Sequence, residues 1–221
     1  RAEVGRQLFI FDLDGTLVDS AADLAAAANR ARAEFGLAPL SVGTIAGFVG
    51  DGIRTMMERV FQDRPEVDLD RVVALQKAHY RAHLCDATRP YPGVEPGLAR
   101  LQARGHALAV ATNKPVEMAD ALLSALRLRS RFSAVLGGGS GLELKPHPAM
   151  IETIRQRLGC AASDTWMIGD HRTDLEAARR AGVHGILVRY GIGDPGPERP
   201  ERAFDTFDAL MDHFVPEGKT A

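Results

Sequence analysis

The chain has 221 residues, with 27 basic and 29 acidic side chains, a formal net charge of −2 and 45% hydrophobic residues. This length suits one large domain or two modest ones, and the small net charge gives no support to an electrostatic binder of nucleic acid or of a membrane surface. No apolar stretch approaches the roughly 20 residues that span a bilayer, and no segment resembles a secretory signal. Cys85 and Cys160 lack a partner motif, so we expect free thiols and a cytoplasmic protein.

The first element in the sequence is a short apolar run that ends in two acids. Residues 8–11 (LFIF) are typical of a strand that is covered on both faces. Asp12 and Asp14 follow at its carboxyl end, where open α/β sheets bind their ligands. Two close carboxylates repel each other unless a cation lies between them or one of them holds a proton. The pair therefore indicates a metal site, acid–base chemistry, or both.

A helical segment follows the first strand. Gly50 and Gly52 interrupt it with a flexible joint or a ligand-facing turn, and it contains no convincing strand. We expect residues 19–87 to form an inserted all-helical domain, and residues 1–18 together with 88–221 to form the main domain. The predicted helices of the insert cover residues 20–35, 41–48, 53–61 and 69–84.

Beyond a Pro- and Gly-rich boundary at residues 90–93, strands and helices alternate. This alternation predicts right-handed β-α-β units, and hence a Rossmann-like, doubly wound parallel sheet with helices on both faces. The Gly- and Pro-rich residues 191–200 are expected to form a loop. Strands are predicted over residues 106–111, 134–136, 165–168 and 185–188, and helices over 97–103, 116–126, 148–158, 174–181 and 207–214.

The strand predicted at residues 106–111 is followed by Thr112, Asn113 and Lys114. Pro115 suits the first turn of the next helix, and Thr112 or Asn113 would cap that helix. A hydroxyl, an amide and free backbone N–H groups at this place would also hold an anion.

Two further strand ends carry charged residues. The strand at 165–168 leads to Asp170, and Asp174 lies one helical turn further on the same side. Two acids that close suggest metal ligation, although a helix cap and a first-turn acid would give the same pattern. Lys145 stands before a stiff Pro-His-Pro segment. Only four of the 27 basic residues are lysines, so Lys114 and Lys145 stand out as compact cations that suit a phosphate site.

Together and in this order, the motifs resemble those of the haloacid-dehalogenase superfamily. The resemblance covers nearly the whole chain, and the helical insert is similar to the C1 cap of that superfamily. The four core motifs correspond to Asp12-Leu13-Asp14-Gly15-Thr16, Thr112-Asn113, Lys145-Pro146, and Gly169-Asp170 with Asp174. Asp19-Ser20, Val49-Gly50-Asp51-Gly52 and Thr112-Asn113-Lys114 are also similar to phosphoglycolate phosphatase-like members.

The resemblance implies a Mg²⁺-dependent phosphatase that hydrolyses a small phosphate monoester through an aspartyl-phosphate, with 2-phosphoglycolate as the first choice of substrate. Asp12 would be the nucleophile, Asp14 the general acid and base, and Lys145 a catalytic cation. Mg²⁺ would bind Asp12, the backbone carbonyl of Asp14, and Asp170. Asp174 would orient this shell or occasionally join it as a ligand.

The resemblance also implies which residues hold the substrate. The phosphate would be bound near the first two motifs, and the insert would contribute contacts to the rest of the ester. The candidates for the phosphate are Gly15, Thr16, Thr112, Asn113 and Lys114. In the insert, Asp51 and Arg54 are candidates for contact with the remainder of the substrate, although a solvated helix start would have the same residues.

Other interpretations of the same motifs stay open. A dehalogenase or a phosphonatase would not need Asp14, which argues against both. A β-phosphoglucomutase-like phosphosugar mutase keeps both acids, and a pyrophosphatase shares every core motif. A receiver-like phospho-acceptor module also places an Asp at a strand end, but it is shorter and lacks the insert. The only partner indicated is a small phosphate ester, and the sequence is compatible with a monomer or a homodimer.

Overall fold

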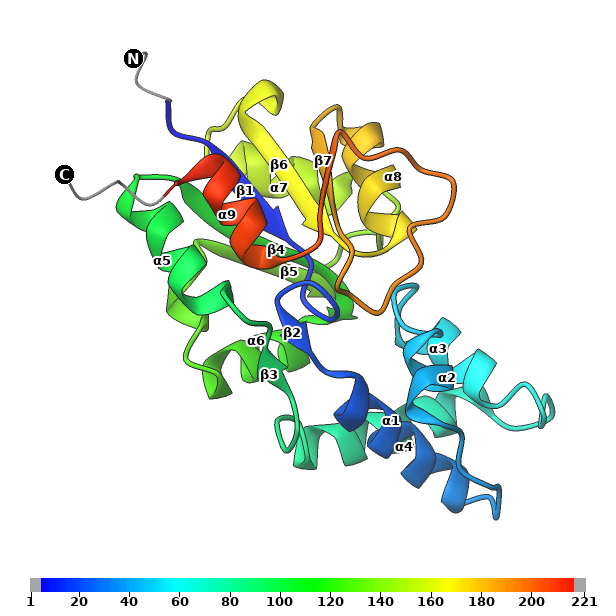
Figure 1. The fold of residues 1–221 in the computed structure, drawn as a ribbon. Helices are drawn as coiled ribbons and strands as arrows, with labels where there is room; N and C mark the ends of the chain where they lie inside the picture. The colour runs from blue at the N-terminus through cyan, green and yellow to red at the C-terminus, as the bar shows by residue number, and fades with distance from the viewer. Residues whose placement is uncertain (1–4, 217–221) are drawn as a thin grey trace.

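A six-stranded, all-parallel sheet forms the centre of the molecule (Figure 1). The computed structural model describes residues 5–216. The strand order β5-β4-β1-β6-β7-β8 places β1 between β4 and β6, and the predicted Rossmann-like parallel sheet is confirmed. The strands are β1 (Leu8–Phe11), β4 (Ala107–Pro115), β5 (Ala134–Gly138), β6 (Thr165–Gly169), β7 (His184–Val188) and β8 (Arg202–Phe204).

Helices cover both faces of this sheet. In β1, Phe9 and Phe11 pack into one apolar layer and Leu8 and Ile10 into the other, because successive side chains of a strand point to opposite faces. With both faces covered, the strand ends are where polar groups can gather. The first layer contains α5 (Val94–Ala103), α6 (Val116–Ala125) and α9 (Phe207–Phe214), and the second contains α7 (Ala149–Arg157) and α8 (Arg172–Ala181).

Four helices are inserted between β2 (Val18–Asp19) and β3 (Arg89–Pro90), and they lie together beyond the carboxyl end of β1 (Figure 1). Their own apolar core combines small alanines of the first helix with larger side chains such as Met57 and Val72. No helix within residues 5–216 has the length and apolar character needed to cross a membrane. The inserted helices are α1 (Ala21–Ala33), α2 (Val42–Ala46), α3 (Ile53–Val60) and α4 (Leu69–Ala82).

The two connections to the insert form an element that was not predicted from the sequence. β2 and β3 pair as a short antiparallel ribbon, and strands of two residues carry no detectable period. The buried Asp23, in the first turn of α1, anchors this ribbon. Its carboxylate accepts hydrogen bonds from the N–H groups of Ala87 (3.0 Å) and Thr88 (2.8 Å) and from the Thr88 hydroxyl (2.7 Å).

One prediction about the elements was wrong, and one strand was not predicted. β4 does not end at residue 111 but continues to Pro115, which pairs with Gly138 of β5 across an irregularity in register. Pro115 is therefore the N-cap of α6 rather than part of its first turn, and neither Thr112 nor Asn113 caps the helix. The edge strand β8, which follows the Gly- and Pro-rich loop, was also missed, because three residues are too few to show a pattern.

Replacing Asp23 with Ala is expected to lower the free energy of unfolding by about 2–4 kcal/mol, because buried donors lose a charged acceptor. Urea denaturation would measure the loss. Asp19→Ala, at an exposed acid of β2, is the matched control and should change stability by less than about 0.5 kcal/mol. Equal losses in the two variants would contradict an anchoring role for Asp23.

Candidate active site

The carboxyl ends of β1 and β6 bring the predicted acidic motifs together. Phe11 is level with Ile168 in the sheet, and the Asp12 N–H donates to the Ile168 carbonyl (2.9 Å). One carboxylate oxygen each of Asp12, Asp170 and Asp174 lies within 4.8 Å of the others, and all three residues are buried. Asp12 and Asp170 therefore lie close together, as the interpretation of the motifs requires.

A loop that follows β7 holds Asp170. The Asp170 Oδ2 accepts hydrogen bonds from the backbone N–H groups of Ile192 (2.9 Å) and Gly193 (2.8 Å). The sequence predicted this segment only as a loop, since backbone N–H donors leave no sequence signature. Gly191 lies so close to Asp170 that a Cβ atom at this position would overlap the carboxylate. The loop therefore fixes one acid of the cluster through its main chain.

Gly15 and Thr16, which were predicted to bind phosphate, support Asp170 in the structure. The Thr16 hydroxyl donates to Asp170 Oδ1 (3.1 Å). Gly15 adopts a φ of +83°, and a Cβ atom there would overlap Asp170. The backbone N–H groups of both residues donate to carbonyls of the same turn. Gly15 donates to Val18 (2.9 Å) and Thr16 to Leu13 (3.2 Å).

Lys145 lies within the acidic cluster. Its Nζ is 3.1 Å from Asp12 Oδ1 and donates to Asp174 Oδ1 (2.6 Å) and to the Ala111 carbonyl (2.6 Å). The second oxygen of Asp174 accepts from the His171 N–H (3.0 Å) and completes a capping box at the start of α8. Both oxygens of Asp174 are thus engaged, and this carboxylate orients Lys145.

Burial sets the protonation of this cluster. Burial raises the pKa of Asp12 to about 6, although the nearby Lys145 opposes the rise. Burial, followed by repulsion from Asp12 and Asp174, raises the pKa of Asp170 to about 8. Burial lowers the pKa of Lys145, but the carboxylates outweigh this effect and the net pKa is raised. Three carboxylates around one ammonium leave excess negative charge, and their oxygens suit a hard divalent cation.

Asp14 stands apart from this cluster and is paired with a different lysine. The Nζ of Lys114 lies 3.0 Å from both carboxylate oxygens of Asp14 and donates to the Tyr80 hydroxyl (2.8 Å). The Ser20 hydroxyl also donates to Asp14 (2.6 Å). Burial lowers the pKa of Lys114, but Asp14 and Tyr80 outweigh it and the net pKa is raised. Lys114, predicted to hold phosphate, therefore supplies a permanent cation beside Asp14.

Asn113 connects three segments of the chain. Its Nδ2 donates to the carbonyls of Gly50 and Lys145 (2.8 Å each), and its Oδ1 accepts from the Lys145 N–H (2.8 Å). Thr112 is buried next to it, and its hydroxyl accepts from the Lys114 N–H (3.2 Å). The extended backbone at the end of β4 thus directs these side chains to the site and to the insert.

The two insert residues predicted to contact substrate do not line the cavity described below. Asp51 forms ion pairs with Arg59 of α3 and with Arg172 of α8, and so links the insert to the main domain. Burial favours a higher pKa for Asp51, but the two arginines outweigh it and the net pKa is lowered. Arg54 is exposed and pairs with Asp70.

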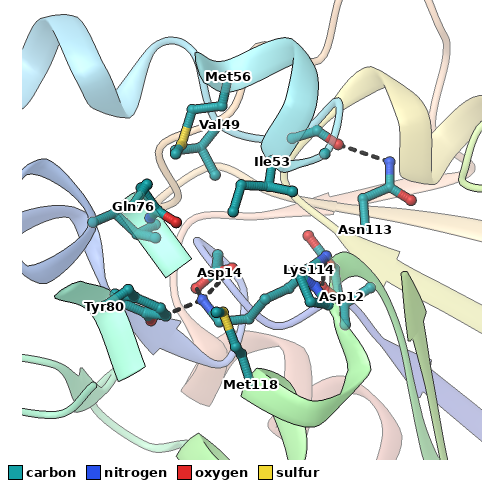
Figure 2. A pocket seen from close by; sticks show the side chains of 15 residues that line it. Asp12, Asp14, Val49, Ile53, Met56, Gln76, Tyr80, Asn113, Lys114 and Met118 are labelled. Atoms are coloured by element: carbon teal, nitrogen blue, oxygen red, sulfur yellow. Dashed lines mark hydrogen bonds and ion pairs between the residues drawn. The ribbon is translucent and has the colours of Figure 1, made fainter. Parts of the chain in front are cut away.

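A cavity that is partly open to solvent lies between the insert and the strand ends (Figure 2). Gln76 and Tyr80 belong to its insert wall and were not predicted. They are four residues apart on the buried face of α4 and carry no motif, although this spacing is the one signal that marks a shared face. Asp12, Asp14, Thr112, Asn113, Lys114 and Met118 form the main-domain wall, and Leu24, Val49, Ile53, Met56, Gln76 and Tyr80 form the insert wall.

Comparison with known proteins decides the family. The sequence pattern of the family described as haloacid dehalogenase-like hydrolase matches residues 9–188. The chain belongs to this family. The resemblance drawn from the motifs is therefore confirmed, and it extends across both the main domain and the insert.

Several similar proteins from other organisms are named phosphoglycolate phosphatase. The phosphoglycolate phosphatase of Neisseria gonorrhoeae is 37% identical over 223 residues, covering 96% of this chain and 94% of the relative. That of Agrobacterium fabrum is 40% identical over 224 residues, covering 97% and 96%. A crystal structure described as a predicted phosphoglycolate phosphatase from Haemophilus somnus matches with a TM-score of 0.88 at 32% identity, covering 94% of this chain and 97% of the other.

Without divalent cations, thermal stability is expected to fall as the pH rises from about 5 to 8. The pKa values of Asp12 (about 6) and Asp170 (about 8) in the folded protein exceed that of an ordinary aspartate, about 4. In this window the folded protein binds more protons than the unfolded chain, so it loses stability as the pH rises through both values. Calorimetry in a chelator would measure the slope.

Asp170→Asn is expected to flatten this pH dependence, because one of the two groups no longer titrates. Glu58→Gln, at an exposed acid of α3, is the control and should keep the wild-type slope. An unchanged slope in Asp170→Asn would show that other groups cause the effect.

Proposed function

We propose that this protein is a Mg²⁺-dependent phosphatase that hydrolyses 2-phosphoglycolate through a phosphorylated Asp12. The observation that carries the proposal is the convergence of Asp170 and Lys145 on Asp12, which lines the cavity together with Asp14. The choice of substrate is supported by the relatives named phosphoglycolate phosphatase, which match this chain over nearly their whole length. Cys85 and Cys160 are free thiols, which supports a cytoplasmic location.

The carboxylates of Asp12 and Asp170 would hold Mg²⁺, with the backbone carbonyl of Asp14 as a further oxygen ligand. When bound, the ion would neutralise charge on the phosphoryl group and favour the ionised form of Asp12. Asp174 would orient Lys145 rather than bind the ion directly, because both of its oxygens already accept hydrogen bonds.

The two acids of the first motif would have different roles because their surroundings differ. Asp12, beside Lys145, would attack phosphorus while the leaving oxygen takes a proton from Asp14. Asp14 would then remove a proton from the water that cleaves the phosphorylated Asp12 and releases inorganic phosphate. Lys145, the Thr112 hydroxyl and the backbone of Asn113 would stabilise the charge on the phosphoryl oxygens.

The products distinguish this function from its alternatives. A phosphosugar mutase would interconvert sugar phosphates without net release of phosphate, and a pyrophosphatase would prefer pyrophosphate to any ester. A receiver-like module would accept one phosphoryl group and stop. Phosphate release from a panel of phosphometabolites, together with product analysis for a sugar 1-phosphate, separates these outcomes.

The purified protein with Mg²⁺ is expected to turn over 2-phosphoglycolate repeatedly. A chelator should abolish the activity, and Asp12→Asn should lower kcat by at least about 10³-fold, since it removes the nucleophile. Asp19→Asn, outside the cavity, is the control and should keep wild-type kinetics. Normal turnover by Asp12→Asn, or in the presence of the chelator, would refute the proposed mechanism.

Lys114→Met is expected to lower kcat for alkyl phosphates about 10- to 100-fold. The reason is that Asp14, after it has given up its proton, loses the ammonium 3.0 Å away that stabilises its charge. The loss should be smaller with p-nitrophenyl phosphate, whose leaving group needs no proton. Arg81→Met, at an exposed position of α4, is the control. Equal losses with both classes of ester would argue against this role.

A further inference from the structure

Gln76 presents a buried amide without a partner in the cavity. The side chain is 1% exposed and lines the cavity, and its Oε1 has no hydrogen-bond partner within residues 5–216. Leaving a buried polar group unpaired is unfavourable, and more than about 90% of such groups in proteins are paired. The unpaired atom is an acceptor, and a half-turn of the amide places a donor N–H group in the same position, so the side chain can pair with a group outside the described chain.

Packing alone does not require an amide at this position. The buried face of α4 consists of Val72, Gln76 and Tyr80, spaced by one helical turn. Apart from the Tyr80 hydroxyl, the other side chains of the insert wall are apolar, among them Val49, Ile53 and Met56. An unbranched apolar side chain such as Met would fill the same space without an unsatisfied polar atom.

The position of Gln76 relates it to the leaving group of the substrate. Figure 2 shows Gln76 and Tyr80 on the insert wall of the cavity and Asp14 and Lys114 on the main-domain wall, where the Lys114 Nζ reaches the Tyr80 hydroxyl (2.8 Å). Asp14 would protonate the leaving oxygen, so the rest of the leaving group must occupy the space between Asp14 and the insert wall. The Lys114 ammonium in this space favours an anionic group over a neutral one.

We propose that Gln76 donates a hydrogen bond to the carboxylate of the leaving group and thereby selects short phosphate esters that end in an acid. The inference rests on the phosphatase function proposed above and adds to it a residue that determines specificity. Rotation of the amide presents its N–H group to the carboxylate. The apolar side chains of the wall offer no partner to the additional oxygens of a larger substrate, which would stay unpaired.

Gln76→Met tests the contact because it keeps the length of the side chain and removes only the amide. We expect kcat/KM for 2-phosphoglycolate to fall about 10- to 100-fold, since the hydrogen bond involves a charged group. For ethyl phosphate, which lacks the carboxylate, kcat/KM should stay within about twofold of the wild-type value. Equal losses with both esters would overturn the proposal, because they would show that the residue shapes the whole site.

Gln76→Glu separates a carboxylate partner from a hydroxyl partner. Glutamate keeps an acceptor but repels an anion, so 2-phosphoglycolate should lose more activity than it does with Gln76→Met. Ethyl phosphate should again be unaffected. If 2-hydroxyethyl phosphate proved the better substrate of the wild type and was retained by Gln76→Glu, the partner would be a hydroxyl donor and the proposal would be wrong.

Thermal stability distinguishes substrate binding from a structural role, because loss of a structural contact would lower Tm. Gln76→Met should leave Tm unchanged or raise it, because an unpaired buried amide is replaced by an apolar group. Gln102→Met is the matched control and should lower Tm, since the Gln102 amide bonds to both the carbonyl and the guanidinium of Arg131. A clear fall in Tm for Gln76→Met would overturn the proposal by revealing a partner within the protein.

The failure of this inference can be told apart from the failure of the proposed function. A wild-type protein that releases no phosphate from any ester in a manner dependent on Asp12 would overturn both. An active wild type whose preference for 2-phosphoglycolate over ethyl phosphate survives in Gln76→Met would overturn only the role of Gln76.

Discussion

Burial of three carboxylates around a single ammonium is the constraint on which the rest of the structure depends. Lys145 contacts Asp12 and Asp174, and Asp170 completes the group. Close like charges away from water are unfavourable, so the surroundings must hold them in place. Covered parallel strands fix Asp12, the capping box of α8 fixes Asp174, and backbone N–H groups fix Asp170. β1, the start of α8 and the loop after β7 thus converge on one crowded site.

The sheet and its motifs could be predicted because they rest on patterns within a few residues. The apolar run of β1 and the acids after it follow from the chemistry of a strand covered on both faces. The end of β4 could not be predicted in the same way. There the pairing of Pro115 with Gly138 overrides the local preference of proline for the first turn of a helix. β2, β3 and β8 are too short to show any period.

The parts of the site that were missed depend on how distant segments dock. Gln76 and Tyr80 face the cavity only because the insert lies against the strand ends, and Gly193 reaches Asp170 only because the loop after β7 folds back. Asp51 was predicted to contact the remainder of the substrate. The structure instead directs it to Arg172, because an arginine at the start of α8 offers it a charged partner across the domain boundary.

The β2–β3 ribbon has a consequence for motion. Both chain crossings between the insert and the main domain run side by side, and Asp23 clamps them together. Two adjacent attachments restrict the insert to swinging about the ribbon, whereas a single attachment would also permit it to twist. Such a swing would break the Asn113 hydrogen bond to Gly50 and the ion pair between Asp51 and Arg172. The same restriction would return α4 to one position over the strand ends, so the cavity wall formed by Gln76 and Tyr80 would be restored after each swing.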